Sequence, residues 1–269
     1  MSVILEKRVQ DPPSGKPSAL AFVAHGRVGG TMNCSITSAI AEHLRLKRNA
    51  RVVKWNARGM GGSEGGNELS GFEEWMGMRN CDDYKDIFKE QVLKFVNDFP
   101  SARGCDLFVC GYSAGAIYAT TVRLSDDVYD QCAQVFSCPV KYILVSYPIG
   151  AAWALGLGLT GWYFRSLEGL VGGYWEGSPH ERPADVLILM GGNEIGGWWS
   201  PVSWAYNMWT GVLNGKHRQE QGKFWKVIVD GADHVWSGKL HRIGEEVERW
   251  MSGLPVRTWT GDTSGWHEN

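Results

Sequence analysis

Three residue types that together can catalyse acyl transfer occur along this chain, each shortly after an apolar run. Ser113 stands between two glycines in Gly-Tyr-Ser-Ala-Gly, residues 111–115, directly after the run LFVC. Small residues at helical spacing follow, which predicts a sharp turn from a buried strand into a helix. In such a turn the two glycines avoid clashes, and the serine hydroxyl is presented above the sheet edge. The alternative is an ordinary strand-to-helix turn in which the serine caps the helix.

His234 is the histidine best placed to act on that serine. A serine hydroxyl is a weak nucleophile near neutral pH until a base accepts its proton. Of the seven histidines, His234 directly follows the last apolar run, in VIVDGADHVWSG, on the edge where Ser113 is expected. The other six fall in a helical pattern, in charged or turn segments, in the tail or in another loop. A loop histidine without a catalytic task is the alternative.

A carboxylate between the serine and the histidine would complete the set. It would fix the tautomer of the imidazole and stabilise the imidazolium. The run DVLILMG is followed by Glu194, whereas Asp185 begins that run, at the wrong end. Asp233 is adjacent to His234, where neighbouring side chains diverge. We expect Glu194 to be the acid and Asp233 the second choice, with a solvated loop role for Glu194 as the alternative.

Backbone amides would stabilise the oxyanion that forms when the serine attacks. One expected donor is the N–H of Ala114, directly after the nucleophile, and the other is the N–H of Gly26 or Arg27 in AHGRVGG. That glycine loop lacks the Lys-Ser/Thr pair of a phosphate-binding P-loop, and its spacing misses GxGxxG. A second glycine cluster, NARGMGGSEGG, is not followed by a helix of the kind that a dinucleotide site needs. The sequence predicts no metal and no organic cofactor.

The elements that must position these residues alternate along the chain. Apolar runs recur as ALAFVAH, ARVVKWN, DLFVCGY, KYILVSY, DVLILMG and WKVIVDGADH. Between them, apolar residues at gaps of three and four predict amphipathic helices over 84–96 and 240–250. The pattern predicts an α/β, doubly wound, mostly parallel sheet with its chemistry in loops at the strand C-termini. Residues 1–252 are expected to form one domain and 253–269 a C-terminal extension.

One segment departs from this alternation. Residues 151–183 are rich in glycine, leucine and aromatic residues, and we expect them to form a short lid or pocket wall. Five tryptophans in and after this segment could line an apolar or aromatic pocket, because flat rings offer a large contact area at little entropic cost. They are Trp153, Trp162, Trp198, Trp199 and Trp204. For any one of them, core packing is the alternative.

The composition argues against several classes of partner. The 269 residues carry a net charge of −2, which leaves no excess positive charge for nucleic acid or an anionic membrane surface. The apolar run near the N-terminus is too short for a signal peptide or a membrane span. Six scattered cysteines without a CxxC pair are expected to be free thiols. We expect a cytoplasmic monomer or homodimer that acts on a small molecule.

Four motifs, in this order, resemble those of the α/β-hydrolase superfamily along nearly the whole chain: AHGRVGG, RGMGGSEG, GYSAG and GADHVWSG. Within the superfamily the chain is similar to small-lid serine esterases and to dienelactone-hydrolase-like or serine-aminopeptidase-like proteins. The resemblance implies an α/β-hydrolase fold with Ser113 as nucleophile, His234 as base and Glu194 as acid. The chain departs from the usual pattern in two respects: the acid is more often aspartate, and the lid is unusually rich in Gly and Trp.

The expected activity is that of a serine hydrolase, which would cleave an ester, thioester or related acyl bond through an acyl-enzyme on Ser113. Two other functions stay open. The same site could catalyse acyl transfer, cyclisation or C–C cleavage, because an aromatic lid could exclude water. The chain could also be a non-catalytic binding protein, since a fold alone does not establish activity.

Overall fold

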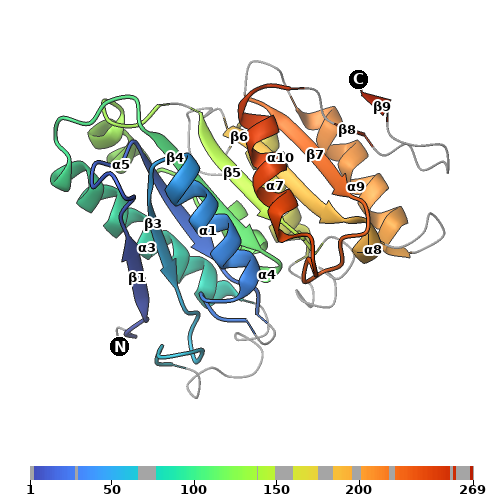
Figure 1. Ribbon diagram of the computed structural model, residues 1–269, viewed down its shortest axis with the longest axis horizontal. Coiled ribbons are helices and arrows are strands. Elements are labelled where there is room, and N and C mark those ends of the chain that lie inside the picture. Colours follow the sequence, from blue (N-terminus) through green and yellow to red (C-terminus); the bar gives the residue numbers. More distant parts are fainter. Residues whose placement is uncertain are drawn as a thin grey trace.

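The structure is a computed structural model that describes residues 3–27, 30–65, 77–137, 139–148, 160–174, 184–195, 201–217, 222–254, 257–258 and 267–268. Its main feature is a seven-stranded sheet with the strand order β1-β3-β2-β4-β5-β6-β7 (Figure 1). β1 is antiparallel to β3, and all other neighbouring strands of this sheet are parallel. The expected fold class, a doubly wound and mostly parallel α/β sheet, is confirmed.

The strands of the sheet are short and, apart from the edge strands β1 and β7, mostly buried. They are β1 Lys7–Gln10, β2 Ala19–Ala24, β3 Ala50–Trp55, β4 Asp106–Tyr112, β5 Val140–Val145, β6 Ala184–Gly191 and β7 Phe224–Val229. A separate antiparallel pair consists of β8 Arg257–Thr258 and β9 His267–Glu268. Every residue of β2 and of β6 is buried, as expected for parallel strands that are covered on both faces.

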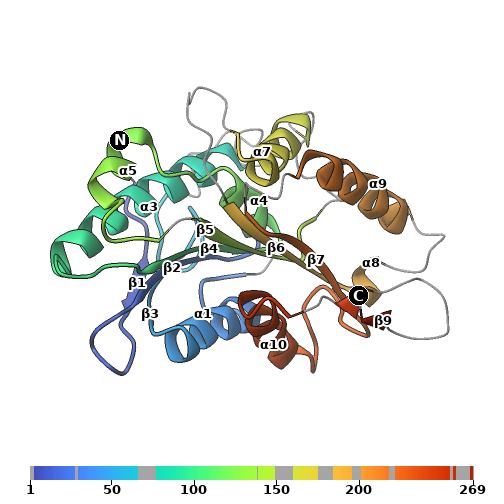
Figure 2. The ribbon, with the colours of Figure 1, turned by 90° about the horizontal axis from the view of Figure 1, so that it is seen from above.

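The helices cover the two faces of the sheet. Those in the described part of the chain are α1 Ser35–Lys47, α3 Met78–Asp98, α4 Ala114–Thr120, α5 Asp126–Cys132, α7 Thr160–Gly172, α8 Gly192–Ile195, α9 Pro201–Lys216 and α10 Leu240–Met251. α1 and α10 lie on one face, and α3, α4, α7 and α9 lie on the other (Figure 2). Each face of the sheet therefore has its own apolar core.

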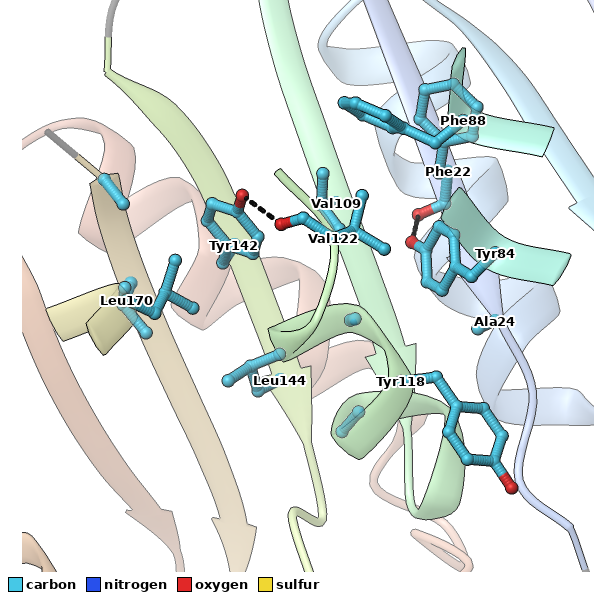
Figure 3. Packing of buried hydrophobic residues seen from close by; sticks show 14 of the residues in the cluster. Phe22, Ala24, Tyr84, Phe88, Val109, Tyr118, Val122, Tyr142, Leu144 and Leu170 are labelled. Carbon is cyan, nitrogen blue, oxygen red and sulfur yellow. Dashed lines mark hydrogen bonds between the residues drawn. The ribbon is translucent and has the colours of Figure 1, made fainter. Parts of the chain in front are cut away.

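The larger core, under α3, α4, α5 and α7, buries tyrosines whose hydroxyls donate to backbone carbonyls (Figure 3). Tyr142 on β5 donates to the carbonyl oxygen of Val122 at 2.9 Å. Tyr84 on α3 donates to the carbonyl oxygens of Cys110 and Phe22 at 3.1 and 3.4 Å. A buried hydroxyl without a partner costs about 1–3 kcal/mol. These bonds let the rings fill an apolar layer without that cost.

The six apolar runs all form strands, and the two predicted helices lie within α3 and α10. The sequence did not predict β1, whose residues KRVQ are mostly exposed. An exposed edge strand needs no apolar face, so it leaves no hydrophobic pattern to detect. It extends the sheet by pairing Lys7 with Trp55 and Gln10 with Val52.

The proposed lid and the C-terminal extension lie partly outside the described residues. Of the segment 151–183, the structure describes α7 and the residues after it up to 174. α7 packs Leu167, Leu170 and Val171 into the larger core, each at most 1% exposed. The domain boundary at residue 252 and a lid function for 151–183 stay predictions.

The cysteines were expected to be free thiols, and no membrane span was expected. Cysteines 34, 81, 105, 110 and 132 are free, and all but Cys34 are buried. Cys138 lies outside the described residues. Among the helices that the structure describes, none combines the length and the apolar character needed to span a membrane.

Candidate active site

The strand order creates a topological switch point at the carboxyl ends of β2 and β4. The chain passes from β2 to β3 on one side and then crosses to β4 on the other side of β2. In open α/β sheets, ligands bind at such a switch point, outside the carboxyl ends of the strands. Ala24 at the end of β2 pairs with Gly111 near the end of β4. The loop that begins at His25 and the turn at Ser113 therefore meet at this switch point.

Ser113 joins β4 to α4 in a strained conformation. Its φ of 53° and ψ of −122° are rare for a residue with a side chain. Its N–H donates to the carbonyl oxygen of Val145 at 2.9 Å, and this bond ties the turn to the neighbouring strand β5. Ser113 is half-buried, and its side chain is not part of either apolar core.

The two glycines that flank Ser113 are required by close backbone contacts. A Cβ on Gly111 would lie 2.1 Å from the carbonyl oxygen of Gly115. A Cβ on Gly115 would lie 2.6 Å from the carbonyl oxygens of both Ala24 and His25. Both distances are far below van der Waals contact with backbone that cannot rotate away. Glycine at these positions lets α4 begin directly against β2 and β4.

His234 and Glu194 form a hydrogen-bonded chain with Ser113. The Nε2 atom of His234 lies 3.2 Å from the hydroxyl oxygen of Ser113, and the Nδ1 atom lies 2.6 Å from Oε1 of Glu194. In the tautomer with hydrogen on Nδ1, the imidazole donates to the carboxylate and can accept the serine proton at Nε2. The other carboxylate oxygen, Oε2, is buried and has no hydrogen-bond partner among the described residues.

The loop of His234 and the short helix of Glu194 are bound to each other through the backbone. The N–H of Asn193 donates to the carbonyl oxygen of Ala232 at 2.9 Å. A Cβ on Gly191, the last residue of β6, would lie 2.5 Å from that same oxygen. Glycine at 191 therefore permits the close approach that holds Glu194 beside His234.

The charge of Glu194 shapes the protonation of His234. The hydrogen bond with Glu194 raises the pKa of His234 above its ordinary value of 6.5, and the negative charges of Glu194 and Asp233 act in the same direction. Partial burial of the ring opposes this, because desolvation disfavours the imidazolium. The His234 side chain is 45% exposed, while that of Glu194 is only 12% exposed. The imidazole of His234 is thus open to a ligand, and the carboxylate of Glu194 is sheltered.

Asp233, the second choice for the acid, has other partners. Its Oδ1 atom accepts a hydrogen bond from the N–H of Ser237 at 2.9 Å. Hydrogen bonds with Ser237 lower the pKa of the Asp233 carboxyl. The carboxylate therefore closes the turn that carries His234 and does not hold the imidazole. Of the three acids considered from the sequence, Glu194, Asp233 and Asp185, the structure brings Glu194 to the ring.

The expected oxyanion donors lie around Ser113. Ala114 is the first residue of α4, so its N–H has no carbonyl partner within its own helix. Gly26 lies so close to the turn that a Cβ on it would be 3.1 Å from the Cβ of Ser113. Arg27 follows Gly26 and ends this described segment of the loop. Gly26 and the start of α4 therefore both lie beside the Ser113 side chain.

His25 shapes the loop of Gly26, a role that the sequence did not indicate. Its Nε2 accepts the N–H of Ala57 at 2.9 Å, so its Nδ1 carries the hydrogen and donates to the carbonyl oxygen of Gly26 at 2.5 Å. Burial lowers the pKa of His25, which keeps the ring neutral and able to make both bonds. His25 thereby joins the loops that follow β2 and β3.

A second unpredicted contact supports the His234 loop from the sheet side. The indole Nε1 of Trp236 donates to Oγ of Ser146 at 3.0 Å, and both residues are fully buried. Both have positive φ, 56° for Trp236 and 50° for Ser146. Together with Ser113, they account for three of the four non-glycine residues of positive φ in the described chain. Strained backbone is concentrated at this site, as is common where structure serves function.

The tryptophans expected to line a pocket are only partly described. Trp153, Trp198 and Trp199 lie outside the described residues. Trp162 on α7 is half-buried, packs against the larger core and meets the ring of Tyr163 edge-on at 5.0 Å. Trp204 on α9 is 66% exposed. Within the described chain, no group of three or more His, Cys, Asp or Glu side chains is arranged to hold a metal ion.

No protein-family profile matches the chain, and no curated protein sequence matches it. Solved structures with a similar fold do match the chain. An α/β serine hydrolase homologue from Coxiella burnetii is 19% identical, with 92% of this chain and 96% of that chain covered and a TM-score of 0.56. An α/β serine hydrolase without a lid from Xanthomonas campestris is 18% identical, with 94% of each chain covered and a TM-score of 0.57.

A third similar structure is Est1E from Butyrivibrio proteoclasticus with ferulic acid bound. It is 15% identical, with 93% of this chain and 95% of that chain covered and a TM-score of 0.55. At such low identities the likeness concerns the fold. The chain has the α/β-hydrolase fold over more than nine-tenths of its length, as the order of its sequence motifs implied.

Proposed function

We propose that this protein is a serine hydrolase that cleaves an ester, thioester or related acyl bond of a small apolar or aromatic molecule. The observation that carries the proposal is the hydrogen-bonded chain from Glu194 through His234 to Ser113, at 2.6 and 3.2 Å. It lies at the switch point of an α/β-hydrolase fold, where such a site binds its ligand. The solved structures of similar fold include serine hydrolases.

In the proposed reaction, Ser113 attacks the carbonyl carbon of the substrate while His234 accepts the hydroxyl proton at Nε2. Glu194 holds the ring in the required tautomer and stabilises the imidazolium that forms. The N–H groups of Ala114 and of Gly26 or Arg27 donate to the oxyanion. His234 then returns the proton to the leaving group, and an acyl-enzyme remains on Ser113. Water then attacks the acyl-enzyme while His234 accepts its proton. His234 returns this proton to the oxygen of Ser113 as the bond to the acyl group breaks and the acid is released.

The substrate class rests on chemistry around the site and on one similar structure. A base whose side chain is 45% exposed can be reached by an external ligand. Est1E, of similar fold, is solved with ferulic acid, an aromatic acid, bound. We propose that tryptophans of this chain, Trp153, Trp162, Trp198, Trp199 and Trp204, contribute flat apolar surface for such a group.

A panel of p-nitrophenyl esters of increasing acyl length, hydrolysed by the wild type and by Ser113→Ala, tests this proposal. We expect the wild type to release p-nitrophenol and the variant to lose on the order of 10⁵-fold or more in kcat, because without the nucleophile no acyl-enzyme forms. The circular dichroism spectrum of the variant should match that of the wild type, since the hydroxyl packs against no core. Wild-type turnover by the variant would show that Ser113 is not the nucleophile.

A further inference from the structure

Tyr112, the residue before Ser113, contacts two other parts of the site through one side chain. Its hydroxyl donates to the backbone carbonyl oxygen of His234 at 3.0 Å. Its ring lies beside the imidazole, with the ring centroids 5.4 Å apart and the planes tilted by 38°. The opposite contact is with Gly26, where a Cβ would lie 3.1 Å from Cε1 of Tyr112. The Tyr112 side chain is 7% exposed, so these contacts are sheltered from water.

The direction of the hydrogen bond is fixed by chemistry. A carbonyl oxygen only accepts, so the phenol donates to it. The bond therefore ties the peptide from which the imidazole projects to the residue next to the nucleophile. On its other side, the His234 loop is held to Ser146, the first residue after β5, by the bond from Trp236. The base is thus carried by a loop that two strands of the sheet hold through side chains.

The distance that needs this support is the one between His234 and Ser113. Their 3.2 Å separation is at the long end for a hydrogen bond to a hydroxyl, and the imidazole is partly exposed. Glu194 fixes the ring from its Nδ1 side but does not fix the backbone that carries it. A misplacement of about 1 Å at a reacting centre can cost on the order of 10²-fold in rate. The Tyr112 hydroxyl restrains that backbone.

We propose that Tyr112 is a positioning residue, which sets the approach of His234 to Ser113 and seats the Gly26 loop against the same turn. The inference rests on the proposed hydrolase function and deepens it. Tyr112 itself touches neither the attacking oxygen nor the substrate carbonyl. It acts through the backbone of His234 and through van der Waals contact with Gly26.

Tyr112→Phe removes this hydroxyl alone, and Tyr142→Phe is the matched control. Tyr142 also donates to a carbonyl oxygen, that of Val122 at 2.9 Å, but lies in the core (Figure 3). Each variant loses a hydroxyl that donates to a carbonyl oxygen. Tyr142→Phe also loses the interaction of that hydroxyl with Arg123, so it should lose at least as much stability as Tyr112→Phe in urea denaturation. With p-nitrophenyl acetate, we expect kcat to fall about tenfold in Tyr112→Phe with little change in KM, and to stay within twofold of wild type in Tyr142→Phe. Equal kcat in the two variants would overturn the proposal.

A second readout separates this proposal from the hydrolase function. If the wild-type protein hydrolyses no ester and reacts with no fluorophosphonate, the proposed function fails, and the imidazole can still be followed by NMR. In Tyr112→Phe the ring should align less well with Glu194, so the pKa of His234 should fall toward its ordinary value. No charge changes in this substitution, and Glu194 and Asp233 remain the acidic groups that face the ring. An unchanged His234 titration would overturn the positioning role in either case.

Discussion

Replacement of Glu194 by glutamine keeps the shape of the proposed acid and removes its charge. In the native site Oε1 accepts from Nδ1 of His234 at 2.6 Å, and Oε2 is buried with no partner among the described residues. The amide has two orientations. In the first, its oxygen keeps the bond to the imidazole and its NH2 group takes the position of Oε2. A buried donor left unpaired there costs about 1–3 kcal/mol.

In the second orientation the NH2 group faces Nδ1 of His234 and donates to it. The imidazole must then carry its hydrogen on Nε2, where it can no longer accept the proton of Ser113. The cost of about 1–3 kcal/mol for the unpaired donor in the first orientation favours this second orientation, with its unproductive tautomer, roughly 5- to 150-fold. A neutral amide also stabilises the imidazolium less than a carboxylate does. We expect kcat/KM to fall about 10³-fold, which corresponds to about 4 kcal/mol of activation free energy.

The assay is hydrolysis of p-nitrophenyl acetate as a function of pH. The wild-type kcat/KM should rise with pH as His234 loses its proton, with its inflection above 6.5, because Glu194 raises the pKa of His234. In Glu194→Gln the plateau of kcat/KM should fall, and the inflection should move to lower pH. A loss of less than tenfold together with an unmoved inflection would refute this reasoning.

Asp233→Asn is the control that shares the charge change. Asp233 accepts from the N–H of Ser237 and makes no bond to the imidazole in the described chain. We expect this variant to keep kcat/KM within about threefold of the wild type, because an asparagine oxygen can still accept from that N–H. Greater harm from Asp233→Asn than from Glu194→Gln would move the acid role to Asp233.

Two further predictions concern the backbone that holds the site, and urea denaturation measures both. Gly115→Ala should destabilise the protein by about 1–3 kcal/mol or more, since its Cβ would lie 2.6 Å from two carbonyl oxygens. The control is Gly211→Ala on α9, which has open space around its Cβ and should not destabilise the protein. Trp236→Phe should cost at least about 1 kcal/mol, because it removes the donor to Ser146 from a buried pair; wild-type stability in this variant would contradict that role.

The sequence predicts the proposed catalytic residues because each carries a local signal. Gly111 reflects a contact within the turn, with Gly115, and Gly115 reflects a contact with the end of β2, so the two glycines mark this turn in the sequence. Glu194 and His234 each follow a strongly apolar strand. Because the strands are parallel, residues that directly follow them lie at the same edge of the sheet as Ser113. Their order along the chain then leaves few combinations to consider.

Other parts of the site arise from register and from long-range contacts. Tyr112 reaches a carbonyl 122 residues away, and Trp236 reaches Ser146 across 90 residues. Neither pair has a local pattern, because each bond exists only once the strands are aligned. Glu194 was expected in a loop but lies in α8, a helix of four residues that is too short to produce a periodic signal.

The reaction of a fluorophosphonate probe with the native protein, followed by intact mass and peptide mapping, tests the central claim most directly. The serine oxygen displaces fluoride from phosphorus only if a base activates it. We predict one phosphonyl group per chain, located on Ser113, and none on Ser113→Ala or on urea-denatured wild type. No labelling of the native protein, under conditions where an established serine hydrolase is labelled, would contradict the account, as would a label on any other residue.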